Sequence, residues 1–316
     1  MRRIVYFGTA DFAVAPLRAL LDAPERFEVV TVVSRPDKPA GRKHVIAVAP
    51  VAALARERGV PLLQPTKLRD AAFRDALVVL SPDLLLVASY GRIIPQEILD
   101  LAKIAPLNLH GSLLPTYRGA SPIQSAILEG ARVTGVSLMI MDAEVDHGPV
   151  ISTEECPIAD DDTHATLERR LGVVAASLLS RDLEAFCAGT LKAATQVHAQ
   201  ATHTSLISKE DGLIDWRKED ASRIERKTRA YSPWPGAYFT WKRDGTEIRV
   251  KILKASVIAA ASQVPAGACF VSPQGMPAIV AAKDVLVLRE VQPEGKKPMD
   301  GKAFLNGHKD FDGAAL

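Results

Sequence analysis

The first half of the chain alternates short apolar runs with segments of helical spacing. The apolar runs predict β-strands at Arg3–Gly8, Phe27–Ser34, Asp83–Ser89, Ile104–Leu109, Thr134–Met141 and Pro149–Glu154. The helical spacing predicts α-helices at Phe12–Leu21, Val51–Arg58, Pro95–Leu101, Ser121–Leu128 and Thr163–Ala188. Strands that alternate with helices in this way predict a doubly wound α/β domain with a mainly parallel sheet.

The pattern changes after Gly189. Leu191–Thr204 is polar and rich in alanine, so we expect a connector there. Beyond it, short alternating runs with turn residues between them predict strands at Ala237–Trp241, Glu247–Lys254, Ala268–Val271, Ala278–Ala281 and Val285–Glu290. Short strands of this kind predict a small OB-like β-barrel. We therefore expect a first domain over residues 1–189, a linker over 190–206 and a barrel domain over 207–316.

The composition fits a globular protein that works in a reducing compartment. Of the 316 residues, 47% are hydrophobic and 24% are charged, which is enough for a sizeable core and for two domains. The three cysteines, Cys156, Cys187 and Cys269, have no paired spacing, which excludes a disulfide framework or a zinc knuckle. Asp11 and Arg18 interrupt the apolar stretch behind the first residues, so we expect a cytoplasmic protein without a signal peptide or membrane span.

The charge is distributed unevenly along the chain. From Ser205 onward there are 18 Lys and Arg residues and 14 Asp and Glu residues, which gives a net charge of +4. The part before Ser205 has 21 Lys and Arg residues and 23 Asp and Glu residues, a net charge of −2. A basic barrel beside a nearly neutral first domain suggests a polyanionic partner. A merely solvated surface would carry the same charges, so charge alone leaves both interpretations open.

The segment Leu107-Asn-Leu-His-Gly-Ser-Leu-Leu-Pro-Thr-Tyr-Arg-Gly119 carries the strongest chemical signal. Asn108 and His110 are two residues apart, so on a strand their side chains leave the same face. An amide can stabilise an oxygen that becomes negative, and an imidazole can move a proton. This pair predicts acyl-group chemistry at a strand end. Ser112 lacks the G-x-S-x-G surroundings of a nucleophile and is expected to form hydrogen bonds in the turn or with substrate.

The segment Met141-Asp-Ala-Glu-Val-Asp-His-Gly148 supplies candidate carboxylates. We expect Asp146 to orient His110, hold its tautomer and favour its protonated form. Asp142, Glu144, Asp146 and His147 could also form a metal cluster, but their spacing does not follow the EF-hand pattern. We therefore prefer the orienting role for Asp146 and expect no metal.

Two further segments suggest ligand contacts. In Tyr90-Gly-Arg-Ile-Ile-Pro95 the glycine allows a close backbone approach, and Ile93 and Ile94 would suit a flat heteroaromatic ligand. Phe7-Gly-Thr-Ala-Asp-Phe12 is similar to the first turn of a nucleotide-binding fold but lacks G-x-G-x-x-G, so a dinucleotide site is not expected. Arg35–Ala40 is rich in Pro, Lys and Arg and is predicted to be a loop that continues toward Ala49.

Taken together, these residues resemble the methionyl-tRNA formyltransferase family over essentially the whole chain. The set Asn108, His110 and Asp146, with Ser112-Leu-Leu-Pro115, is shared by folate-dependent formyltransferases. Other matching segments are Phe7–Phe12, Arg35–Arg42, Tyr90-Gly91, Ile94-Pro95, Tyr117-Arg-Gly119, Thr134-Gly-Val136 and Ile214-Asp-Trp216. Pro233-Trp-Pro-Gly236 and Gln292-Pro-Glu-Gly-Lys-Lys297 point more narrowly to the tRNA enzyme.

The resemblance implies 10-formyltetrahydrofolate as the formyl donor and the α-amine of methionyl initiator tRNA as the acceptor, with no metal. It implies catalytic roles for Asn108, His110 and Asp146. It implies folate contacts for Tyr90, Gly91, Ile93, Ile94, Pro95, Ser112, Leu113, Leu114, Pro115 and Asp142. It implies tRNA contacts for the barrel and for Arg35, Lys38, Arg42 and Lys43. The expected protein is a monomeric enzyme of translation initiation.

The loop after Arg42 departs from the family pattern. The family has a longer stretch rich in glycine and lysine, whereas this chain has Lys43-His-Val-Ile-Ala-Val-Ala-Pro-Val51. Three alternatives remain open. They are a formyltransferase acting on a 4-amino sugar nucleotide with the same donor, a metal-dependent hydrolase built on His110, Asp142, Asp146 and His147, and an RNA-binding protein without catalytic activity.

Overall fold

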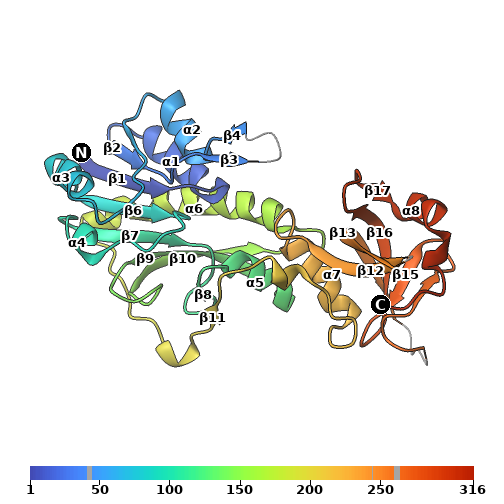
Figure 1. The fold of residues 1–316 in the computed structure, drawn as a ribbon. Helices are drawn as coiled ribbons and strands as arrows, with labels where there is room; N and C mark the ends of the chain where they lie inside the picture. The colour runs from blue at the N-terminus through green and yellow to red at the C-terminus, as the bar shows by residue number, and fades with distance from the viewer. Residues whose placement is uncertain (41–44, 244, 260–263) are drawn as a thin grey trace. The chain divides into compact units, whose positions relative to one another are not determined.

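The computed structural model of this chain describes residues 1–40, 45–243, 245–259 and 264–316 (Figure 1). The chain folds into two compact units. The first unit contains Met1–Pro122, Val133–Pro157 and Leu167–Ser205, and the second contains Ile123–Arg132, Ile158–Thr166 and Leu206–Leu316. Two segments from the range expected to form the first domain therefore belong to the second unit, and residues 190–205 belong to the first.

The first unit is built on a seven-stranded sheet with the strand order β10-β9-β7-β6-β1-β2-β5. The parallel strands are β1 (Arg2–Gly8), β2 (Phe27–Val33), β5 (Leu62–Leu63), β6 (Leu84–Ala88) and β7 (Ala105–His110). The antiparallel strands at one edge are β9 (Val133–Ile140) and β10 (Val150–Pro157). This is the doubly wound, mainly parallel sheet that the sequence predicts.

The central strands of this sheet carry apolar residues on both faces, and these residues pack against helices. Val5 and Phe7 of β1 pack with Phe73 and Leu77, while the neighbouring residue Tyr6 donates its hydroxyl hydrogen to the carbonyl of Ala13 at 2.6 Å. The helices before residue 190 are α1 (Val14–Leu21), α2 (Pro50–Glu57), α3 (Ala71–Leu80), α4 (Gln96–Leu99), α5 (Pro122–Glu129) and α6 (His164–Cys187). Of these, α5 belongs to the second unit from Ile123 onward, as do the first residues of α6 up to Thr166.

The order of the strands defines a switch point in the sheet. From β1 the chain proceeds outward through β2 and β5, then returns to the other side of β1 to form β6 and β7. In doubly wound sheets, ligands bind outside the carboxyl ends of the strands at such a point. The loops after β1, β6 and β7 are therefore expected to form a binding site.

The structure corrects the prediction of a loop over Arg35–Ala49. Within this range β3 (Lys38–Ala40) pairs in antiparallel fashion with β4 (Val45–Ala47). The proline and the charges predicted a loop, but the β-branched Val45 and Ile46 favour extended backbone. Three helices were also not predicted from the sequence, namely α3, α7 (Ala221–Ala230) and α8 (Gly301–Gly307).

The second unit contains a curled antiparallel half-barrel. Its strand order is β12-β13-β16-β15-β14, and β17 pairs with β16. The strands are β12 (Ala237–Arg243), β13 (Thr246–Ile258), β14 (Cys269–Val271), β15 (Pro277–Val280), β16 (Val285–Pro293) and β17 (Met299–Asp300). Each of the strands predicted beyond residue 205 is present, because short alternating runs between turn residues are a local signal.

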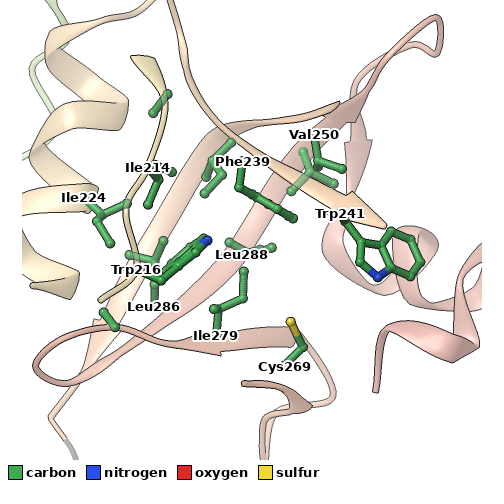
Figure 2. Packing of buried hydrophobic residues seen from close by; sticks show 14 of the residues in the cluster. Ile214, Trp216, Ile224, Phe239, Trp241, Val250, Cys269, Ile279, Leu286 and Leu288 are labelled. Carbon is green, nitrogen blue, oxygen red and sulfur yellow. The ribbon is translucent and has the colours of Figure 1, made fainter. Parts of the chain in front are cut away.

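The main core of the second unit contains a group of aromatic side chains (Figure 2). Trp241 makes edge-to-face contacts with Phe304 and Phe311, and Trp216 makes one with Phe239. The other large members of this core include Ile214, Ile224, Val250, Ile279, Leu286 and Leu288. A helix and strands far apart in the sequence thus contribute to one apolar cluster, which lets this unit hold a core of its own.

The division into units changes the charge asymmetry seen in the sequence. The segment Ile158–Thr166 brings Asp160, Asp161 and Asp162 into the second unit, and Ile123–Arg132 adds one acidic and one basic residue. Counted in this way, the second unit has 19 Lys and Arg against 18 Asp and Glu, a net +1. Any attraction of this unit for a polyanion must therefore depend on where its basic groups lie.

No helix within the described residues is long and apolar enough to cross a membrane.

Glu168 on α6 should make the stability of the first unit depend on pH. Burial, with a further contribution from the negative charge of Asp11, raises the pKa of this carboxyl from 4.5 to about 7. The unfolded chain therefore loses the proton at a lower pH than the folded chain, and stability falls as the pH rises from 4.5 to about 7. Glu168→Gln stays neutral and should escape this loss.

We therefore expect Glu168→Gln to unfold like the wild type near pH 4.5 and to be more stable at pH 8, by at most about 3 kcal/mol. Urea unfolding at several pH values measures the difference. Glu57→Gln is the matched control, because Glu57 is an exposed glutamate at the end of α2. Equal pH profiles for wild type and Glu168→Gln would contradict the prediction.

Candidate active site

Asn108 and His110 lie at the carboxyl end of β7, between β6 and β9. Asn108 is in register with Val87 of β6 and Met139 of β9, and His110 with Ser137 of β9. Both side chains approach the same oxygen atom, Oδ1 of Asp146. They therefore leave the same face of the strand, as their two-residue spacing predicts.

The carboxylate of Asp146 connects three groups, two of them on β7 and one on the loop that follows it. Its Oδ1 accepts a hydrogen bond from Nδ2 of Asn108 at 3.2 Å and lies 3.5 Å from Nδ1 of His110. Its Oδ2 accepts a hydrogen bond from the backbone N–H of Gly119 at 2.8 Å. The Asp146 side chain is about nine-tenths buried, with 10% of its surface exposed, so these contacts replace most of its water. The position of this carboxylate sets the relative placement of Asn108 and His110.

The contact with Asp146 determines how the Asn108 amide is oriented. A carboxylate only accepts hydrogen bonds, so the NH₂ group of Asn108 must face it. One of the two N–H bonds on Nδ2 is used in this contact. Among the described residues, no acceptor is recorded for the other N–H.

His110 is held at both ring nitrogens. Its Nε2 lies 2.9 Å from the carbonyl oxygen of Tyr117, an acceptor, so Nε2 carries a hydrogen. The 3.5 Å distance from Nδ1 to Asp146 is longer than an ordinary hydrogen bond. Nδ1 is therefore the less firmly engaged nitrogen. Only 5% of the histidine surface is exposed.

Glycine is required at position 119 for the Asp146 contact. Gly119 has φ of +108°, a conformation that other residues rarely adopt, and a Cβ atom there would lie 2.5 Å from the carbonyl oxygen of Thr204. Any larger residue would have to shift the backbone. The N–H of Gly119 would then move away from the Asp146 carboxylate.

Ser112 and the residues after it form a tightly bonded turn. The hydroxyl of Ser112 donates to the carbonyl of Thr116 at 2.6 Å, and its own carbonyl accepts from the hydroxyl of Ser137 at 2.7 Å. The N–H of Leu114 donates to the hydroxyl oxygen of Ser137 at 3.0 Å. These bonds fix the segment 112–115, in which we expect folate contacts, directly after His110.

The segment after β6 presents both buried and exposed side chains. Tyr90 and Ile94 are only 1% and 5% exposed and belong to the core of the first unit, whereas Ile93 is 82% exposed. Gly91 has φ of +75°, and a Cβ atom there would lie 3.3 Å from Nη1 of Arg35. Of the two isoleucines, Ile93 is thus the one whose side chain is open to a ligand, while Ile94 anchors the segment.

Tyr90 also brings a polar atom into the core. Its ring packs edge-to-face on Phe7 at 5.4 Å between ring centres, and its buried hydroxyl has no hydrogen-bond partner among the described residues. Burial raises the pKa of this phenol above its ordinary value. Its carbonyl accepts a hydrogen bond from the hydroxyl of Thr9, which joins the loops after β6 and β1.

The acidic residues of 142–147 face different partners. Asp142 contacts His147 through Oδ2 and Nδ1 at 2.7 Å, while the side chain of Asp146 faces Asn108, His110 and Gly119. The ring of His147 stacks on His198 at 4.1 Å. Within the part of the chain that the structure describes, no group of three His, Cys, Asp or Glu side chains is placed to hold a metal ion.

The residues expected to contact tRNA lie in or near the β3–β4 segment. Arg42 and Lys43 fall outside the described residues, and Lys38 begins β3. Arg35 precedes this strand, and its backbone N–H donates to the hydroxyl of Thr9 at 3.4 Å. Arg35 therefore lies beside the loops that follow β1 and β6.

Several groups at this site were not predicted from the sequence. They are the Tyr117 carbonyl, the Gly119 N–H, Arg118 and Gln196, of which the first three belong to the Tyr117–Gly119 segment. Backbone groups have no signature of their own in a sequence. Gln196 lies in the polar stretch that was expected to be a connector, and nothing local distinguishes it from its neighbours.

Comparison with known proteins identifies related chains along the full length. Residues 2–183 match the formyl transferase family, and residues 206–309 match the formyl transferase C-terminal domain. The methionyl-tRNA formyltransferase of Desulfotalea psychrophila is 42% identical over 97% of this chain and 93% of that protein. The protein of the same name from Myxococcus xanthus is 41% identical over 97% of this chain and 95% of its own length.

Solved structures share the fold at lower identity. HypX from Aquifex aeolicus in complex with tetrahydrofolic acid is 18% identical with a TM-score of 0.61, over 100% of this chain and 49% of that one. WlaRD, a sugar 3N-formyl transferase, is 17% identical with a TM-score of 0.62, over 94% of this chain and 99% of that one. With two matching domains and relatives above 40% identity over nearly all of its length, the chain belongs to the methionyl-tRNA formyltransferase family.

Proposed function

We propose that this protein transfers the formyl group of 10-formyltetrahydrofolate to the α-amine of methionyl initiator tRNA, the modification that prepares this tRNA for translation initiation. The observation that carries the proposal is the placement of Asn108 and His110 around one oxygen of Asp146. An amide donor and an imidazole side by side at the end of a strand suit formyl transfer. The relatives named methionyl-tRNA formyltransferase, at 40–42% identity, support the choice of acceptor.

In this reaction Asn108 stabilises the negative charge that forms on the formyl oxygen. A bond forms between the amine nitrogen and the formyl carbon, and the bond from that carbon to the folate nitrogen then breaks. Between the two events the former carbonyl oxygen is negatively charged. The N–H of Asn108 that does not contact Asp146 donates to this oxygen.

His110 moves the proton that the amine loses. Its Nδ1, which is less firmly engaged than Nε2, takes up the proton and later returns it to the departing folate nitrogen. Asp146 stabilises the positively charged ring, and the Tyr117 carbonyl keeps the ring from rotating. No covalent bond to the protein is needed, so a Ser112 whose hydroxyl is occupied by Thr116 is consistent with the mechanism.

The folate occupies the carboxyl end of the sheet between the loops after β6 and β7. Gly91 and the exposed Ile93 lie on one of these loops, and the turn 112–115 lies on the other. The remaining folate contacts are assigned to Tyr90, Ile94, Pro95 and Asp142, with Tyr90 and Ile94 contributing through their backbone because their side chains are buried.

We assign tRNA contacts to the second unit and, separately, to Arg35, Lys38, Arg42 and Lys43 of the first. Two features of the second unit suit a nucleic acid: Trp234 is 52% exposed in Pro233–Gly236, and Lys296 and Lys297 are exposed between β16 and β17. A flat aromatic ring can stack on a base, and ammonium groups can contact phosphates. Binding both substrates at once supplies rate through proximity.

Formyl transfer to charged initiator tRNA, compared with transfer to a 4-amino sugar nucleotide, tests this proposal. We expect rapid 10-formyltetrahydrofolate-dependent transfer to the tRNA and none to the sugar nucleotide. Preference for the sugar nucleotide would overturn the assignment of the acceptor. Activity that chelation abolishes and a divalent metal restores would instead favour a metal-dependent hydrolase.

Asn108→Ala and His110→Ala should each reduce the single-turnover rate of formyl transfer. Loss of an oxyanion donor typically costs about 10²–10³-fold in kcat, and loss of a general acid–base group about 10²–10⁴-fold. Folate affinity should remain near the wild-type value, because neither role concerns ground-state binding. Asn306→Ala, at the exposed end of α8, is the matched control. Near-normal transfer by either active-site variant would refute its assigned role.

Lys296→Glu/Lys297→Glu should raise KM for tRNA and leave KM for folate unchanged. For each lysine that binds a phosphate, the substitution should also reduce the steepness of the salt dependence of tRNA binding by about one unit on a log–log plot. The comparison is Lys67→Glu/Lys192→Glu, the same charge change at exposed lysines of the first unit. If both double variants weaken tRNA binding equally, the second unit has no special role.

Arg42→Ala should weaken productive engagement of tRNA, and Arg42→Lys should restore only part of the loss. Lysine keeps the positive charge but lacks the planar set of donors that can bind a phosphate or a base edge. Kinetics in which tRNA and folate are varied separately provide the measurement. If both variants show wild-type dependence on tRNA concentration, Arg42 does not contact the tRNA.

A further inference from the structure

Residues Ala194–Ser205, which follow α6, form a segment that we call the strap. The strap makes hydrogen bonds with both loops that build the candidate active site. One of these loops, 141–149, carries Asp146. The other, 111–119, carries the Tyr117 carbonyl and the Gly119 N–H. The strap is therefore more than the connector that its polar composition predicts.

On one side the strap contacts the Asp146 loop and Val150, the residue of β10 that directly follows this loop. The backbones of Ala194 and Val150 exchange two hydrogen bonds, of 2.8 and 2.9 Å. Two residues further on, Nε2 of Gln196 donates to the carbonyl oxygens of Asp146 at 3.0 Å and Gly148 at 2.7 Å. A single side-chain amide thus binds the backbone of Asp146 and that of the residue two positions later.

On the other side the strap contacts the loop after β7. The backbone N–H of Arg118 donates to the carbonyl of Thr202 at 2.9 Å, and that of Tyr117 donates to the hydroxyl of Thr202 at 2.8 Å. Strand β11 (His203–Thr204) then pairs with β8 (Arg118–Gly119) in parallel. These bonds fix the backbone on both sides of Arg118, including the groups that hold His110 and Asp146.

Arg118 and Gln196 join the two sides. Oε1 of Gln196 accepts hydrogen bonds from Nε and Nη2 of Arg118 at 3.1 and 2.7 Å, and both residues are buried, with 5% and 7% exposed. A guanidinium only donates, so the oxygen of the Gln196 amide must face it and the NH₂ group must face the two carbonyls. Because its partner is charged, this bond is stronger than one between neutral groups.

The backbone that Gln196 holds is unusual. Asp146 has φ of +53°, in the left-handed region that residues other than glycine seldom occupy. Such a conformation persists when surrounding contacts impose it. The two bonds from Gln196 hold the carbonyl of this residue and that of Gly148, two positions later. If the turn relaxed, the Asp146 carboxylate would swing away from Asn108 and His110.

We propose that Gln196, oriented by Arg118, is a positioning residue that acts on formyl transfer through Asp146. The inference rests on the proposed function, since it assigns Gln196 to the same site. Gln196 contacts backbone carbonyls and a guanidinium, and we assign its effect on the reaction to the direction of the Asp146 carboxylate.

Gln196→Glu is the sharpest test, because the carboxylate keeps the size and the contact with Arg118 but cannot donate to the two carbonyls. A misplacement of about 1 Å can cost roughly 100-fold in rate, so we expect kcat to fall by about 10- to 100-fold. KM for folate and for tRNA should stay near the wild-type values. Gln200→Glu is the matched control: the same change on the same segment, at an exposed residue.

Gln196→Met provides a second variant without the added charge. It preserves length and apolar volume, and it lacks the two donors. It should lower kcat as Gln196→Glu does. Its midpoint temperature of thermal unfolding should stay close to that of the control variant Gln200→Glu. If Gln196→Glu fails to fold, the Gln196→Met measurement still decides the question.

A double-mutant cycle with Asp146→Asn separates positioning from general support of the fold. If Gln196 acts through the Asp146 carboxylate, Gln196→Met should reduce kcat far less in the Asp146→Asn background than in the wild type. Equal fold-reductions in both backgrounds, or wild-type kcat in Gln196→Met, would overturn the inference. Failure of the wild-type protein to formylate tRNA would instead overturn the proposed function.

Discussion

The hydrogen bonds to the Asp146 carboxylate are the interactions on which the candidate active site depends. One oxygen is shared between the Asn108 amide and the His110 ring, and the other is held by the Gly119 N–H. A carboxylate that is about nine-tenths buried loses much of its hydration, and that loss is offset only if its remaining contacts are well placed. In the proposed mechanism the same contacts leave one N–H of the amide for the substrate and leave Nδ1 as the less firmly engaged nitrogen of the imidazole. One arrangement therefore satisfies both the geometry that the proposed mechanism needs and the burial of the charge.

That arrangement is supported by backbone geometry as much as by side chains. Gly119 reaches the carboxylate because it lacks a Cβ atom that would collide with Thr204, and Asp146 itself occupies a left-handed conformation. The Tyr117 carbonyl, another backbone group, fixes the imidazole. The sheet contributes the rigid part, since β7 is hydrogen-bonded on both sides. The loops contribute the groups whose direction matters, and hydrogen bonds from the strap hold these loops in place.

The second unit shows that net charge is a poor guide to a nucleic-acid surface. The carboxyl-terminal part of the sequence is basic, but the folded unit also includes Asp160–Asp162 and is nearly neutral. Dissolved salt screens the attraction between charges that lie more than about 8–10 Å apart. A phosphate group is therefore attracted mainly by the charged groups closest to it. For the proposed binding of tRNA, exposed groups such as Lys296, Lys297 and Trp234 therefore matter more than the total charge.

The sequence by itself determined the longer strands of both units, the mainly parallel architecture and the pairing of Asn108 with His110. These features follow from local periodicity: alternate residues on a strand share a face, and apolar runs between turn residues become strands. Tertiary structure alone decided the rest. It placed α5 and Ile158–Thr166 in the second unit, paired β3 with β4, and brought Gln196 to a loop 50 residues earlier in the chain. The physical reason is that contacts between distant segments determine these features. Such contacts decide where a backbone carbonyl points, which residue adopts a left-handed turn and which groups a buried amide binds. No pattern within a short stretch of sequence records them.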